Sequence, residues 1–157
     1  MVAFLAVISQ ISIPTVFSVP ITLQIFALTL IGYLFSWKKS ILVVLIYVCL
    51  GAVGIPVFAS FQGGVFHLIS YTGGFVWGFF PLVLLCSIKI KKMKIPFGIL
   101  GVILCHMLGV IQYSLIGHIS FVSAFLTMSL PYIVKDFILV VLAYACARAI
   151  NSRIKTK

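Results

Sequence analysis

Long apolar runs take up almost the whole sequence, and they decide which solvent the folded chain can live in. Hydrophobic residues make up 64% of the 157 residues, and charged residues make up only 8%. A soluble domain is about half apolar and about a quarter charged, because its surface has to carry charge. The sequence therefore predicts an integral membrane protein of the all-α class, surrounded mostly by lipid.

Prolines, glycines and lysines divide the chain into runs that we expect to be membrane-spanning helices. At roughly 20 residues per span, the length allows about six spans in a single membrane-embedded domain over residues 1–157. The first helix should be short, because Pro14 and Pro20 enclose a segment that cannot be helical. Residues 118–130 should form a mixed connection with some helix. The six expected runs are residues 1–13, 21–37, 41–59, 73–88, 96–117 and 131–150.

The cations lie almost entirely in the connections that follow the second, fourth and sixth runs. Connections after even-numbered spans all lie on one side of a membrane, and the positive-inside rule makes that side cytoplasmic. We therefore expect a multi-pass protein of the plasma membrane with both termini in the cytoplasm. Of the eleven cations, the ones in these connections are Lys38, Lys39, Lys89, Lys91, Lys92, Lys94, Arg148, Arg153, Lys155 and Lys157.

The formal net charge of +10 would suggest a nucleic-acid partner in a soluble chain. Here topology and anionic lipid headgroups are enough to explain the basic connections, so no nucleic acid is expected. Docking of a cytoplasmic partner on the same cations is the alternative.

Asp136, the only acidic residue, lies in the outer part of the last run beside Lys135. A charge inside a span costs several kcal/mol unless it is paired or faces a cavity, so it indicates a functional site. The long stem of Lys135 can carry its charge up to the interface, whereas the short Asp136 needs an internal partner. We predict a substrate-binding role for Asp136; a purely structural ion pair is the alternative.

Other polar or glycine-rich features are expected at the same depth, and together they predict one polar pocket open to the outside. Two are glutamines near outer helix ends, and one is a helix start whose free N–H groups favour an anion. The candidate binding residues, besides Asp136 and Lys135, are Gln24, Gln112, Thr72, Gly73, Gly74, Gly63 and Gly64. His106, near the middle of its run, is expected to be a packing residue.

Several kinds of enzyme are poorly supported. The sequence has no phosphate-binding loop for ATP hydrolysis and no His-Glu-x-x-His metal motif, and one carboxylate cannot supply a two-carboxylate mechanism. No catalytic residue, cofactor or metal is therefore expected, and any energy input must come from a partner or a gradient.

Short motifs spread over nearly the whole chain resemble the BioY family, the biotin-specific substrate-binding (S) components of energy-coupling factor transporters. Val-Pro-x-Thr-x-Gln and Thr-Gly-Gly are the most specific of them. The matching stretches are residues 10–14, 19–24, 50–59, 63–64 and 72–75, together with the opening of the last run at residues 131–136.

The resemblance implies a six-helix bundle that binds biotin near the outer face. It also implies coupling to a transmembrane scaffold protein and two cytoplasmic ATPases, although some members work without dedicated partners. By this resemblance Asp136 and Gln24 would meet the ureido ring, and either Lys135 or the helix start at Thr72 would receive the carboxylate. One departure is Leu139, where the family commonly has a lysine.

Three alternatives remain open from the sequence. An S component for a different vitamin would show the same charge pattern. A small membrane-embedded enzyme or chaperone acting on lipid would need catalytic groups near the cytoplasmic headgroups. A pore would need repeated polar residues along the spans.

Overall fold

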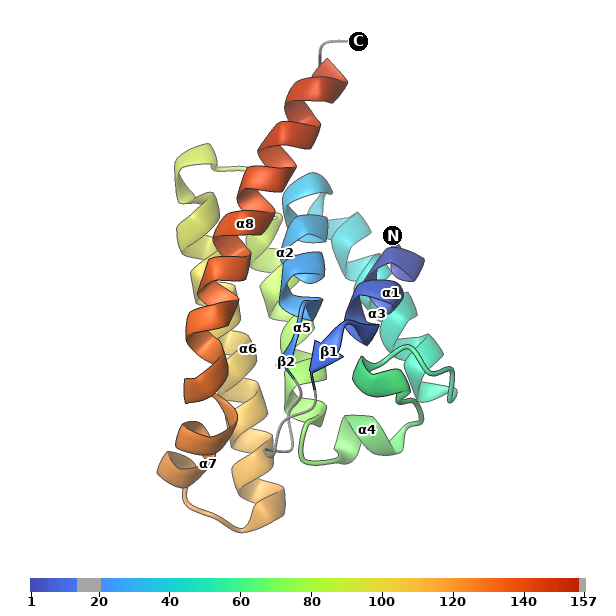
Figure 1. The fold of residues 1–157 in the computed structure, drawn as a ribbon, viewed down its shortest axis with the longest axis vertical. Coiled ribbons are helices and arrows are strands. Elements are labelled where there is room, and N and C mark those ends of the chain that lie inside the picture. The colour runs from blue at the N-terminus through green and yellow to red at the C-terminus, as the bar shows by residue number, and fades with distance from the viewer. Residues whose placement is uncertain (14–20, 156–157) are drawn as a thin grey trace.

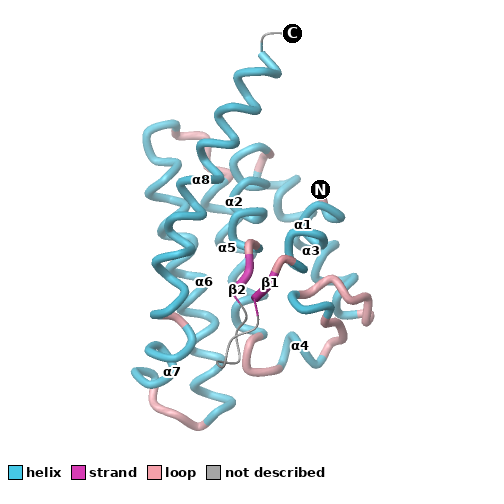
Figure 2. Tube along the Cα trace, in the orientation of Figure 1, coloured by secondary structure: helices cyan, strands magenta, loops and turns pink. Residues whose placement is uncertain are grey.

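The computed structural model describes residues 1–13 and 21–155, and these form a helical bundle (Figures 1 and 2). The expected all-α class is confirmed, with a very small two-stranded hairpin as the only sheet in the described ranges. The predicted loop at residues 14–20 lies outside them.

Four of the helices have more than twelve residues, and the hairpin and single turns fill the connections. The α-helices are α1 (Val2–Gln10), α2 (Gln24–Leu34), α3 (Trp37–Ala52), α4 (Phe66–Ile69), α5 (Gly73–Cys86), α6 (Lys94–Gly117), α7 (Phe121–Met128) and α8 (Leu130–Lys155). The 3₁₀ turns are η1 (Ala59–Phe61) and η2 (Lys91–Met93), and β1 (Ser12–Ile13) pairs antiparallel with β2 (Ile21–Thr22).

Two expectations about the helices are confirmed and two are corrected. The first helix is short, and α7 supplies the helix expected between residues 118 and 130. Lys38 and Lys39, expected in a loop, lie in the first turn of α3, because the chain turns at an extended Ser36. The last helix does not end near residue 150 but continues through Arg153, where cations favour the negative end of a helix dipole.

The basic segments gather at one end of the molecule. Figure 1 shows the α2–α3 connection, the α5–α6 connection and the C-terminal end of α8 at the top, with α4 and α7 at the opposite end. This arrangement agrees with the prediction that the connections after even-numbered runs share one side.

Helix α6 combines length and apolar composition in the way a membrane span requires. Within the described ranges it is the helix long and apolar enough to cross a membrane, and α2 and α5 are shorter apolar helices. Exposed apolar side chains recur along α6 every three or four residues, so they form one stripe. The stripe comprises Leu100, Leu104, Leu108, Ile111 and Leu115.

Helices α5 and α6 pack on one another more extensively than any other pair, and glycines make this possible. A Cβ added to Gly74 would overlap Leu108 O and lie 2.8 Å from the Cα of Gly109. A Cβ at Gly78 would lie 2.6 Å from the Cα of Cys105. Small residues that allow close backbone approach are typical of helix pairs in membranes, and here they fix α5 against α6 beside the candidate site.

Candidate substrate-binding site

A cavity of about 120 Å³ lies among α2, α5, α6 and α8, next to the hairpin and the segment that follows α3. Polar and aromatic side chains converge on it from elements far apart in the sequence. Its polar lining residues are Thr22, Gln24, Gln62, His67, Thr72, His106, Tyr132, Lys135 and Asp136. The rest of the wall is formed by three phenylalanines, Phe58, Phe75 and Phe79, together with small and aliphatic residues.

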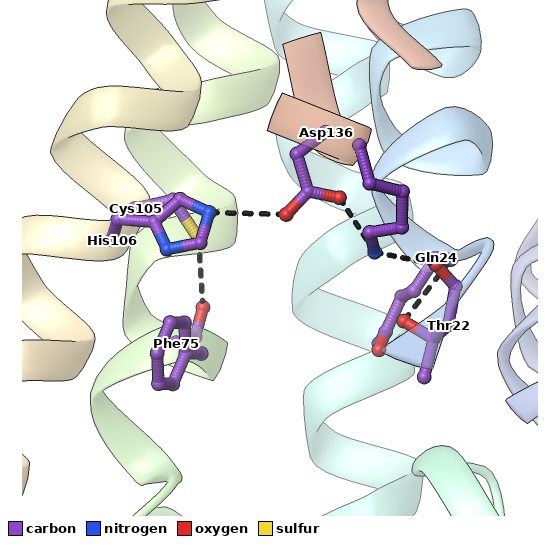
Figure 3. A network of polar contacts seen from close by, with 7 residues as sticks. Thr22, Gln24, Phe75, Cys105, His106 and Asp136 are labelled. Atoms are coloured by element: carbon purple, nitrogen blue, oxygen red, sulfur yellow. Dashed lines mark hydrogen bonds and ion pairs between the residues drawn. The ribbon is translucent and has the colours of Figure 1, made fainter. Parts of the chain in front are cut away.

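Asp136 is the centre of a charged cluster in the wall of this cavity (Figure 3). The residue is 3% exposed. Its Oδ2 lies 3.0 Å from His106 Nε2, and its Oδ1 lies 2.7 Å from Lys135 Nζ. The expectation that Asp136 has an internal partner is therefore confirmed, and two groups share that role.

The expectation that Lys135 extends to the membrane interface is wrong. Its ammonium group contacts the Asp136 carboxylate and also donates to the carbonyl oxygen of Thr22 in β2, at 2.9 Å. The same flexible stem that would allow Lys135 to reach water also allows it to fold back to these two acceptors. Lys135 and Asp136 therefore both line the cavity, although adjacent residues start on different helix faces.

His106 is the functional candidate that the sequence interpretation missed. Its Nε2 donates to the Asp136 carboxylate, and its ring stands edge-on to Phe75, with centroids 5.6 Å apart. The sequence placed His106 mid-span and Asp136 near an outer helix end, so they did not look close. Figure 1 shows the reason: α7 lies beside the outer turns of α6, so α8 begins part-way along α6.

Gln24 lines the cavity from the first turn of α2 and is tied to the buried Tyr47 of α3. Its Nε2 donates to Tyr47 Oη at 2.9 Å. Thr72, the residue just before α5, also lines the cavity. The structure thus brings together four of the residues predicted from the sequence, namely Gln24, Thr72, Lys135 and Asp136.

The other predicted residues lie outside the cavity wall, and most have packing roles. Gln112 Nε2 donates to the carbonyl oxygens of Leu68 and Ser70, which fastens the α4–α5 connection to α6. Gly73 lies against the same Leu68 carbonyl, where a Cβ would overlap it. Gly74 packs against α6, as described above.

The glycine pair in the loop after α3 has conformational roles as well. A Cβ on Gly63 would lie 2.6 Å from Ile55 O. Gly64 has a φ of 103°, which L side chains rarely adopt. Close backbone packing and a positive φ therefore account for this glycine pair without a contact to a ligand.

The arrangement suits a small molecule that is polar at some points and apolar over the rest. The charged cluster supplies a carboxylate and an ammonium group, and the amide of Gln24 and the hydroxyl of Thr72 supply uncharged hydrogen-bonding groups. Aromatic and aliphatic side chains cover the remaining wall, and an apolar lining with a few polar groups is the usual composition of a ligand pocket.

Comparison with known proteins gives a consistent family. The model of the BioY family matches residues 1–156. The chain is 35% identical over 137 residues to the probable biotin transporter BioY of Pyrococcus horikoshii, covering 87% of this chain and 83% of that protein. It is 36% identical over 121 residues to the biotin transporter BioY of Thermotoga maritima, covering 74% and 71% of the two chains.

A solved structure has the same fold. The crystal structure of the S-component for biotin from an ECF-type ABC transporter superposes with a TM-score of 0.87, at 22% sequence identity. The match covers 96% of this chain and 86% of that one. The resemblance seen in the sequence motifs is confirmed: the chain belongs to the BioY family.

Proposed function

We propose that this protein binds biotin in the cavity around Asp136 and takes part in its uptake, as the S component of an energy-coupling factor transporter. The observation that carries the proposal is the charged cluster of Asp136, His106 and Lys135 in the wall of an aromatic-lined cavity. Relatives named as biotin transporters support the choice of ligand.

The chemistry of the cavity matches the parts of biotin. Biotin has a ureido ring with donors and acceptors, an apolar thioether ring and a carboxylate tail. Asp136 and Gln24 supply groups for the ureido ring, and Phe58 and Phe75 supply apolar surface for the thioether ring. Lys135, as the cation of the cluster, or Thr72 at the start of α5, is suited to the carboxylate.

The whole chain acts, in this proposal, as one membrane-embedded substrate-binding unit. It has no phosphate-binding loop, so the energy for transport comes from elsewhere. A transmembrane scaffold protein with two cytoplasmic ATPases is the partner set that the family resemblance implies.

Uptake of labelled biotin tests both substrate and coupling. The chain is expressed in a host that lacks its own biotin transporter, with and without a scaffold and ATPases, and the same host without the chain serves as the control. Uptake that exceeds this control and is competed by biotin, but not by other vitamins, is expected. Competition by another vitamin would indicate that this vitamin is the substrate instead. Uptake equal to the control would show that the chain does not transport biotin.

The proposed topology places the protein in the plasma membrane with α1, α2, α3, α5, α6 and α8 as spans and both termini in the cytoplasm. Cysteine labelling in a background without the native cysteines tests it, using one residue at each end of the bundle. A membrane-impermeant maleimide should label Ile119→Cys in intact cells and Lys39→Cys only after the membrane is opened. Both side chains have exposed surface. The reverse labelling pattern would show that the topology is opposite to the one proposed.

A further inference from the structure

A buried chain of hydrogen bonds links α1, α3 and α2 behind the cavity wall. Ser9 and Tyr47 are completely buried, and Gln24 is 8% exposed. The hydroxyl oxygen of Tyr47 lies 3.1 Å from Ser9 Oγ, 2.9 Å from Val57 O and 2.9 Å from Gln24 Nε2. Three polar neighbours therefore meet at one hydroxyl group, which has a single proton to give.

Counting protons fixes the direction of each bond. The carbonyl oxygen of Val57 can only accept, so its 2.9 Å contact with Tyr47 Oη requires the Tyr47 proton, although Gln10 Nε2 also donates to this carbonyl at 3.1 Å. Ser9 gives its own proton to Leu5 O at 2.7 Å and faces Tyr47 as a further acceptor. With its proton committed to these acceptors, Tyr47 has only lone pairs left for Gln24. The amide of Gln24 must therefore turn its NH₂ group toward Tyr47.

A glutamine on its own can present either end of its amide, because the two ends differ little in shape. We propose that Tyr47 is a positioning residue that removes this freedom, so that Gln24 offers its carbonyl oxygen Oε1 to the cavity. This part of the wall then recognises an N–H donor on the ligand, such as a ureido N–H. The inference rests on the proposed binding of biotin and specifies which ligand group Gln24 recognises in that site.

The test compares biotin with two analogues in which one or the other ureido N–H is replaced by a ring oxygen. Each analogue keeps nearly the same shape but presents an acceptor where biotin has a donor. Dissociation constants are measured on the purified full-length protein for the wild type, Tyr47→Phe and Gln24→Met. Tyr33→Phe is the matched control, because Tyr33 is also buried but donates to Lys94 O and does not line the cavity.

The wild type and Tyr33→Phe should bind one of the two analogues about tenfold more weakly than biotin, because an acceptor then faces an acceptor. In Tyr47→Phe the amide of Gln24 can turn and donate to the ring oxygen of the analogue. The ratio of the analogue's dissociation constant to that of biotin should therefore fall toward one. Gln24→Met has no carbonyl oxygen and should show the same fall. A ratio of affinities does not depend on how much protein is folded, so partial misfolding does not affect it.

A ratio that stays at its wild-type value for both analogues, in either Tyr47→Phe or Gln24→Met, would overturn the inference. A wild type that binds both analogues as tightly as biotin would do the same. These results differ from failure of the proposed function, in which the wild type itself binds no biotin.

Discussion

Replacing Asp136 by asparagine is expected to weaken biotin binding by about 100-fold, or about 2.7 kcal/mol. It is also expected to lower the free energy of unfolding by about 2–5 kcal/mol. Both oxygens of Asp136 have charged or polar partners, so the change leaves Lys135 and His106 facing a neutral amide. Titration with labelled biotin and thermal unfolding in detergent measure the two effects.

A double variant separates the two roles of the carboxylate. In Lys135→Met/Asp136→Asn both charges are absent, so no unpaired ammonium group remains at the cavity wall. We expect stability to recover toward the wild type while biotin binding stays weak. Unchanged biotin binding in Asp136→Asn would remove the central residue of the site. Equal instability of the single and double variants would show that the unpaired cation is not the cause.

Gly74→Val is expected to lower the free energy of unfolding by about 3 kcal/mol, because overpacking forces neighbouring atoms apart. The neighbours here are backbone atoms of Leu108 and Gly109, which cannot rotate away as a side chain can. Separation of α5 from α6 would also move Phe75 away from His106, so biotin binding should weaken as well. Thermal unfolding and biotin titration on the same samples record both effects.

Gly117→Val is the matched control on α6. A Cβ at Gly117 would meet its nearest neighbours at an ordinary 3.6 Å, so we expect much less destabilisation. Similar unfolding curves for the two variants would show that α5 does not approach α6 as closely at Gly74 as the structure indicates.

The fold class and the outline of the site could be predicted from the sequence because both depend on the cost of placing groups in lipid. That cost is a property of each residue. An apolar run must be helical in a bilayer, since its backbone groups have no water to bond with. A lone acidic residue in such a run must find a partner or a cavity, which singled out Asp136 before its surroundings were known.

The contacts between residues within the site could not be predicted from the sequence, because they depend on how far one helix is displaced along another. The sequence by itself determined a helical membrane protein with its basic connections on alternate loops and one buried carboxylate. Only the tertiary structure decided that His106 contacts Asp136. This contact forms because α7 lies beside the outer turns of α6, so that α8 begins part-way along α6. It also decided that Lys135 folds inward, since the acceptor at Thr22 comes from the hairpin. Such contacts follow from the axial offset between packed helices, which no single run of residues contains.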